Sequence, residues 1–138
     1  MDNKKILIVD DDPDVRHGMH VRLKANHYDT FFASDALSSI VEARTHAPDL
    51  IILDLGLPAG DGFVVMERLK TIPALAMIPI VVVSARDVRI NKDLALKAGA
   101  KAFLQKPVDT AEFLAVVRRA LGEPARSEKP VVYDLGSV

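Results

Sequence analysis

The sequence predicts an α/β fold, a five-stranded doubly wound parallel sheet with helices on both faces. Its 138 residues have the length of one domain. Five short apolar runs alternate with amphipathic stretches, the order of five strand–helix units joined by right-handed crossovers. Three of these runs are almost continuously apolar, as in strands buried on both faces. A barrel of the same units needs eight of them and about 250 residues.

The five strands are predicted from the apolar runs. In chain order they span residues 6–9, 28–32, 50–53, 80–83 and 102–104. The first, third and fourth runs are rich in β-branched side chains, which favours a strand covered by helices on both sides. The second run is the weakest of the five.

The helices are predicted from capping residues that precede apolar side chains at helical spacing. The expected N-caps of the first, second, third and fifth helices are Asp12, Ser34, Asp61 and Asp109. The second helix is expected to bury Leu37, Ile40 and Val41. The fourth helix, about residues 91–98, is short and ends before Gly99, a residue suited to the position after a helix.

Composition and charge exclude several classes of function. The 18 Lys and Arg residues against 19 Asp and Glu give a net charge of −1, which argues against nucleic-acid binding. The absence of Cys excludes disulfides, thiolate zinc sites and a cysteine nucleophile. No apolar run reaches the roughly 18 residues that span a bilayer, and the N-terminus lacks the pattern of a signal peptide. We therefore expect a cytoplasmic location and no membrane contact.

The chain changes character towards its C-terminal end. We expect one domain over residues 4–121, followed by a polar linker or tail over residues 122–138. This last segment is too small to be a domain, so it is interpreted as a disordered tail or as the start of a truncated output domain. Residues 131–133 within it form a candidate for a short extra strand.

Reactive side chains follow four of the five predicted strands. In an open parallel sheet, sites form outside the carboxyl ends of the strands, so these side chains should converge. They are Asp10 and Asp11 after the first strand, Asp54 after the third, Ser84 after the fourth and Lys106 after the fifth.

The chemistry of this set is specific. Clustered carboxylates repel one another unless a cation lies among them, and oxygen ligands without nearby His or Cys favour Mg²⁺. A hydroxyl and an ammonium beside a metal-bound carboxylate suit a phosphoryl group. The sequence therefore predicts that a carboxylate acts as the nucleophile and forms an acyl phosphate.

Four groups of motifs occur in order along the chain. They are Ile6-Leu7-Ile8-Val9-Asp10-Asp11-Asp12-Pro13, Leu53-Asp54-Leu55-Gly56-Leu57-Pro58 with Asp61-Gly62, Val83-Ser84-Ala85, and Gly99-Ala100 with Lys106-Pro107. Together they resemble the receiver domain of bacterial two-component response regulators, from about residue 4 to residue 121. The resemblance implies a flavodoxin-like (βα)5 fold with the strand order 2-1-3-4-5.

The resemblance also implies which residues bind metal and phosphate. Asp54 is expected to accept a phosphoryl group from a histidine kinase. Asp10, Asp11 and Asp54, together with the backbone carbonyl of Gly56, are expected to hold Mg²⁺ or Mn²⁺. The domain is not expected to be an enzyme beyond a weak autophosphatase activity.

Further residues are assigned to binding and switching by the same resemblance. Ser84 and Lys106 are expected to bind the phosphoryl group, and the Lys106–Pro107 bond is expected to be cis. Ser84 and Phe103 are expected to form the conformational switch. Gly56 and Arg86 occupy positions that tune dephosphorylation in the family.

The partners follow from the resemblance as well. A sensor histidine kinase or a phosphotransfer protein is expected to supply the phosphoryl group in a phosphorelay. An output domain or partner protein is expected on the face formed by the fourth helix, fifth strand and fifth helix. A homodimer of the phosphorylated form is a further expectation.

Two other functions fit parts of the same pattern. A haloacid-dehalogenase-like phosphatase also uses a strand-end aspartate, which would be Asp10, but Asp14 stands where that class has Thr or Val. A flavodoxin-like electron carrier shares the fold, but Asp10, Asp11 and Asp12 would repel the phosphate of FMN. A phosphoenzyme trapped on Asp10 would favour the first alternative, and a flavin-coloured protein the second.

Overall fold

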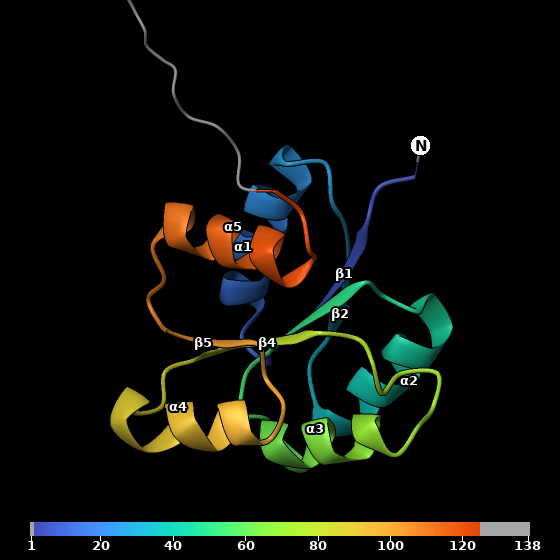
Figure 1. Ribbon diagram of the computed structural model, residues 1–138, viewed down its shortest axis with the longest axis vertical. Coiled ribbons are helices and arrows are strands. Elements are labelled where there is room, and N and C mark those ends of the chain that lie inside the picture. Colours follow the sequence, from blue (N-terminus) through green and yellow to red (C-terminus); the bar gives the residue numbers. More distant parts are fainter. Residues whose placement is uncertain (1, 125–138) are drawn as a thin grey trace, which may run out of the picture.

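The computed structural model describes residues 2–124 and has five strands alternating with five helices (Figure 1). The elements are β1 (Lys5–Val9), α1 (Pro13–Ala25), β2 (Asp29–Ala33), α2 (Ala36–His46), β3 (Leu50–Leu53), α3 (Gly62–Lys70), β4 (Ile80–Ser84), α4 (Val88–Lys97), β5 (Ala102–Gln105) and α5 (Thr110–Ala120). The strands are parallel and lie in the order β2-β1-β3-β4-β5. The predicted fold class and strand order are therefore confirmed.

The sheet is the middle of three layers. Figure 1 shows α1 and α5 on one face and α2, α3 and α4 on the other. Because side chains alternate along a strand, Ile6 and Ile8 pack towards α1 and α5, whereas Leu7 and Val9 pack in the opposite cluster. All residues of β3 and β4 are buried, which explains their continuous apolar sequence.

The helix boundaries confirm three of the four predicted caps. The side chains of Asp12, Asp61 and Asp109 each accept hydrogen bonds from amides of the first turn that follows. The cap of α2 is Asp35 and not Ser34, because its carboxylate reaches the Ser38 amide at 2.7 Å.

The buried face of α2 also differs from the prediction. Ile40 is buried as expected, but Leu37 and Val41 are 66% and 52% exposed. The helix packs instead through small side chains on the face of Ile40, namely Ala36, Ser39 and Ala43. Small residues allow the helix to approach the sheet closely, so the apolar pattern indicated the wrong stripe.

The remaining differences concern the short helix α4 and the end of the chain. α4 begins three residues earlier than predicted, at Val88, because Asp87 caps it. Gly99 follows its C-cap with a φ of 110°, which suits glycine. The candidate strand over residues 131–133 lies outside the described residues.

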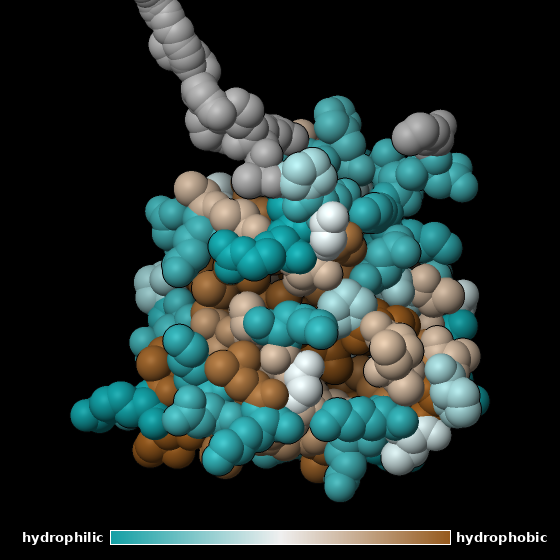
Figure 2. Space-filling model, viewed as in Figure 1, coloured by the Kyte–Doolittle hydropathy of each residue, from teal (hydrophilic) through white to brown (hydrophobic). Residues whose placement is uncertain are grey.

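The surface is largely hydrophilic. Figure 2 shows hydrophilic side chains over most of one face, with apolar side chains between the two helix layers. Within residues 2–124, no helix combines the length and the apolar character that crossing a bilayer requires.

Candidate functional site

The sheet register brings the predicted side chains to one edge. Val9 pairs with Leu53 in neighbouring strands, so the residues that follow them, Asp10 and Asp54, emerge side by side. The Asp54 amide donates to the Val9 carbonyl at 2.9 Å and fixes this placement. On the other side, the Lys106 amide donates to the Ser84 carbonyl at 2.9 Å. Backbone pairing therefore sets the positions of all four residues.

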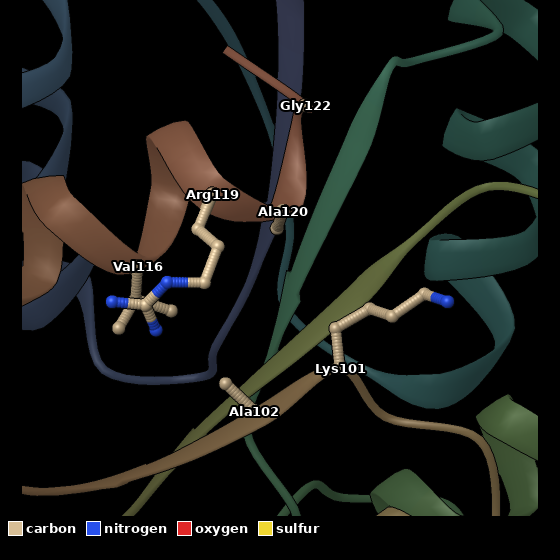
Figure 3. Close-up of a pocket in the computed structure, with 6 residues that line it drawn as sticks. All are labelled: Lys101, Ala102, Val116, Arg119, Ala120 and Gly122. Carbon is tan, nitrogen blue, oxygen red and sulfur yellow. The ribbon is translucent and has the colours of Figure 1, made fainter. Parts of the chain in front are cut away.

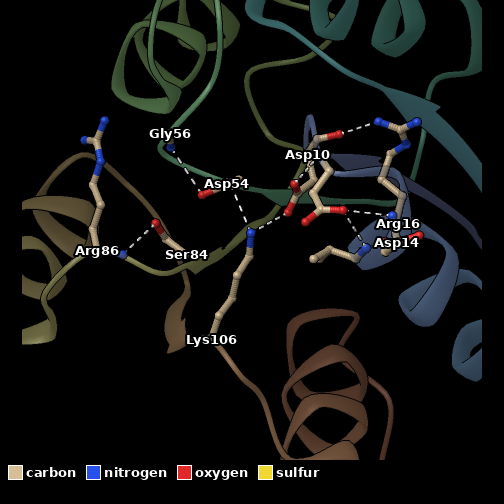
Figure 4. A network of polar contacts seen from close by, with 10 residues as sticks. Asp10, Asp14, Arg16, Asp54, Gly56, Ser84, Arg86 and Lys106 are labelled. Atoms are coloured by element: carbon tan, nitrogen blue, oxygen red, sulfur yellow. Dashed lines mark hydrogen bonds and ion pairs between the residues drawn. The ribbon is translucent and has the colours of Figure 1, made fainter.

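The ammonium group of Lys106 lies between two carboxylates (Figure 4). Its Nζ atom is 2.7 Å from Asp10 Oδ2 and 3.1 Å from Asp54 Oδ2. The other oxygen of each carboxylate faces a backbone amide: Asp12 donates to Asp10 Oδ1 at 2.9 Å, and Gly56 donates to Asp54 Oδ1 at 3.2 Å. The cluster is thus held by one cation and two loop amides.

Burial makes the charges of this cluster costly. Asp10 is 1% exposed and Asp54 is 7% exposed. Burial raises the pKa of the Asp10 carboxyl above its usual value, and the Lys106 ammonium and the Asp12 amide offset only part of this effect. Burial also opposes the charge of Lys106, but Asp10 and Asp54 outweigh it and raise the pKa of the ammonium. The site therefore favours a further cation among its acids.

The acids are arranged in a way that fits a divalent cation. Asp10, Asp11 and Asp54 each place a carboxylate oxygen within 4.8 Å of the others. Asp10 Oδ2 is a fully buried carboxylate oxygen whose partner is the Lys106 ammonium, at 2.7 Å. A cluster of three carboxylates that offers only oxygen ligands suits Mg²⁺ or Mn²⁺.

Gly56 and Ser84 lie at this edge in different ways. A Cβ atom on Gly56 would meet no heavy atom within 4 Å, so no steric contact requires glycine there, and any role lies in its backbone. Ser84 is buried, and its hydroxyl accepts a hydrogen bond from the Arg86 amide at 3.2 Å. In this structure the Ser84 hydroxyl is thus engaged with the β4–α4 loop and not with the carboxylates.

Phe103 lies on β5, beside Val82 of β4. Its side chain is buried in the cluster that faces α2, α3 and α4. The aromatic ring is therefore in an inward position in this structure. The Lys106–Pro107 peptide bond is cis, as expected.

Two contacts at the site have no signal in the sequence. Arg16 of α1 donates from Nη1 to the Asp10 carbonyl oxygen at 2.7 Å, and its position among other charged residues of the helix does not distinguish it. Arg86 forms an ion pair with Asp61, whose predicted role was that of a helix cap. The first contact depends on the turn between β1 and α1, and the second on the packing of two separate loops.

A hollow lies away from this edge of the sheet (Figure 3). It has a volume of about 320 Å³ and lies between the start of β5 and the end of α5. Its lining residues are Lys101, Ala102, Val116, Arg119, Ala120 and Gly122. Because Ala102 begins β5 and Lys106 follows its end, this hollow is at the opposite edge of the sheet from the carboxylates.

Comparison with known proteins identifies the family. The model of the response regulator receiver domain matches residues 6–118. The chain belongs to this family. Its relatives include the KDP operon transcriptional regulatory protein KdpE of Escherichia coli, which is 37% identical over 125 residues, 91% of this chain and 54% of KdpE. The alkaline phosphatase synthesis transcriptional regulatory protein PhoP of Bacillus subtilis is 37% identical over 86% of this chain and 49% of PhoP.

Solved receiver domains share the fold. The BeF3-activated N-terminal receiver domain of Klebsiella pneumoniae RstA is 29% identical, with a TM-score of 0.80, and the match covers 86% of this chain and 98% of that one. The receiver domain of the Francisella response regulator 1452 is 28% identical, also with a TM-score of 0.80, over 87% of this chain and 98% of that one. This chain therefore aligns with nearly the full length of each of these two solved receiver domains.

Membership of this family decides between the classes of function that the sequence left open. Receiver domains are signalling domains that interact with histidine kinases and output domains, which argues against the phosphatase and the electron carrier. The chain spans about half the length of the curated relatives it matches first, at 54% of KdpE and 49% of PhoP. What a whole protein containing this receiver domain controls is thus a matter for proposal.

Proposed function

We propose that this receiver domain accepts a phosphoryl group on Asp54 and changes conformation in response. The observation that carries the proposal is the position of the Asp54 carboxylate, with Oδ2 at 3.1 Å from the Lys106 ammonium and two further acids within ligand distance. A nucleophile in this position has one fixed positive charge beside it and room for a second in the form of a metal ion.

The transfer step follows from these neighbours. An Asp54 oxygen attacks phosphorus, the phosphorus–nitrogen bond of a phosphohistidine breaks, and the released imidazole nitrogen takes up a proton. Lys106 stabilises the negative charge on one phosphoryl oxygen, and Ser84 donates to another after its hydroxyl leaves the Arg86 amide. Asp10, Asp11, Asp54 and the Gly56 carbonyl would hold a Mg²⁺ or Mn²⁺ ion, which would supply positive charge beside the phosphoryl oxygens when bound.

The donor is a sensor histidine kinase or a phosphotransfer protein. A hollow of about 510 Å³ adjoins Lys106 and is lined by α1 residues such as Val15 and Met19 and by Pro107. Its mainly apolar walls beside Lys106 support docking of a partner that carries the phosphohistidine.

Phosphorylation changes the surface that the domain presents to its partners. Movement of Ser84 towards the phosphoryl group, coupled to Phe103 on β5, repacks the face formed by α4, β5 and α5. Exposed apolar side chains on α4, Ile90 and Leu94, support a binding role for this face. It binds an output domain, another protein or a second phosphorylated copy, and this domain makes no direct contact with nucleic acid.

The remaining parts of the proposal concern the chain as a whole. Residues 4–121 form the receiver unit, and residues 122–138 form a linker or tail, or the start of an output domain. The domain hydrolyses its own acyl phosphate slowly and acts in the cytoplasm as part of a phosphorelay. A phosphatase that uses Asp10 is the alternative that the same acids would serve.

The proposal is tested with acetyl phosphate or beryllofluoride in the presence of Mg²⁺. We expect amide shifts around Asp54 and across α4, β5 and α5, and we expect Asp54→Asn to abolish them. Glu67→Gln, which neutralises an exposed acid on α3, outside the responding face, is the matched control and should respond like the wild type. Borohydride reduction of the acyl phosphate followed by peptide mass spectrometry should place the modification at Asp54. Modification at Asp10, or an Asp54→Asn protein that responds fully, would refute the assignment.

A further inference from the structure

Asp61 makes two kinds of contact with its two carboxylate oxygens. Oδ1 accepts the amide hydrogens of Phe63 and Val64, at 3.0 and 3.3 Å, and caps α3. Oδ2 lies 3.6 Å from Nη1 of Arg86, in the loop between β4 and α4. Because the cap fixes the carboxylate, the second oxygen is a stationary partner for the guanidinium.

Arg86 is anchored by its main chain, so only its side chain can exchange one partner for another. Its amide donates to Ser84 Oγ at 3.2 Å, and its carbonyl accepts from Gln105 Nε2 at 3.3 Å. Figure 4 shows its side chain extending away from Asp54 and Lys106. The guanidinium is thus attached beside the phosphoacceptor, yet it is directed elsewhere.

We infer that Asp61 is a positioning residue that holds the Arg86 guanidinium away from Asp54, so that an anion on Asp54 competes with Asp61 for Arg86. This inference rests on the proposed function and goes beyond the capping role of Asp61. If Asp61 acts in this way, the Asp61–Arg86 ion pair of the resting state lowers the affinity of the site for an anion on Asp54.

The energetics allow the exchange in both directions. The side chains of Arg86 and Asp61 are each 37% exposed, and an ion pair with this exposure is weak and easily broken. A phosphoryl group or its fluoride analogue offers Arg86 more negative charge and several acceptor oxygens or fluorines. The Ser84 hydroxyl leaves the Arg86 amide when it turns to the anion, which loosens the same loop at the same time.

The decisive variant is Asp61→Asn, because asparagine caps a helix about as well as aspartate but carries no charge. Beryllofluoride affinity in saturating Mg²⁺ is measured by amide shifts for wild type, Asp61→Asn, Arg86→Ala and the double variant. We expect Asp61→Asn to tighten binding roughly two- to fivefold, the range set by an exposed ion pair. In the Arg86→Ala background, the same exchange should have less than half this effect.

A matched control separates positioning from simple loss of charge. Asp35→Asn removes the charge of another helix cap, that of α2, and should leave the affinity unchanged. Equal tightening by Asp61→Asn in both Arg86 backgrounds would mean that the charge alone matters, and it would overturn the inference. So would the absence of any tightening.

A second measurement needs neither metal nor anion. The heteronuclear NOE of the Arg86 Nε–Hε group in the free protein should fall in Asp61→Asn towards that of Arg44, an exposed arginine on α2. An unchanged NOE would contradict the positioning role. A wild type that fails to bind the anion would overturn the proposed function and this inference with it, whereas a responsive wild type without coupling would overturn the inference alone.

Discussion

Replacing Gly62 with alanine tests how tightly α3 is fitted against the backbone that follows β3, at Asp54 and Leu55. Gly62 is the first residue of α3, and helix propensity by itself predicts that alanine stabilises the protein by at most about 1 kcal/mol. The structure predicts the opposite. A Cβ atom on Gly62 would lie 2.6 Å from the Asp54 carbonyl oxygen and 2.9 Å from the Leu55 Cα.

The size of the effect follows from what must move. Both contacts are with backbone, and the Gly62 amide is tied to the Leu55 carbonyl at 2.8 Å, so the clash cannot be relieved by a side-chain rotation. Overpacking of this kind costs about 1–3 kcal/mol. After the gain in propensity is subtracted, we expect Gly62→Ala to lower the free energy of unfolding by up to about 2 kcal/mol. The shift of Asp54 should also weaken beryllofluoride binding.

Two other glycines serve as controls. At Gly18 in α1, the new Cβ atom would meet only the end of the flexible Arg22 side chain at 3.3 Å, so alanine should stabilise the protein by about 0.5–1 kcal/mol. At Gly56, no heavy atom lies within 4 Å of the new Cβ atom, and little change is expected. Urea unfolding followed by far-ultraviolet circular dichroism measures all three variants. A Gly62→Ala protein as stable as Gly18→Ala would refute the reasoning.

Three further predictions follow from the ion pairs and caps. Lys106→Met should tighten Mg²⁺ binding in calorimetry, because it removes a cation 2.7 Å from Asp10 Oδ2, and weaker binding would contradict this. Asp109→Ala should cost about 1 kcal/mol of unfolding free energy and Asp109→Asn little, since only alanine loses the cap of α5; equal losses in urea unfolding would argue against capping. The Ser38 amide and hydroxyl hold the pKa of Asp35 below its usual value, so Asp35 contributes stability above its unfolded pKa that is lost as the pH falls through the folded one. Asp35→Asn should therefore lose stability less steeply than the wild type below about pH 4, and parallel curves would contradict this.

The sequence predicted the strands well because their burial is nearly complete. A strand covered on both faces must be apolar at every position, and the runs at residues 50–53 and 80–83 carry that signal without ambiguity. The second helix was less predictable. Its large side chains, Leu37 and Val41, lie on the exposed side, while the buried contact uses alanines and serines that a hydropathy pattern weights weakly.

The convergence of Asp10, Asp54, Ser84 and Lys106 was predictable for a related reason. In a parallel sheet, the residues that follow the strands all lie at the same edge. The place of a residue directly after a predicted strand therefore predicts where it lies in the fold. Which partner each group takes was not predictable. The Ser84 hydroxyl is turned to the Arg86 amide, and Lys106 bridges both acids.

The sequence by itself thus determined the layers of this receiver domain, its strand ends and the types of side chain gathered there, because these depend on local periodicity and chain direction. Only the tertiary structure decided the contacts between loops, such as that of Asp61 with Arg86. The physical reason is range. Hydrophobic periodicity can be recognised within a few consecutive residues. An ion pair or hydrogen bond between loops depends on ångström-scale distances, and the chain brings those groups together only after the core has packed.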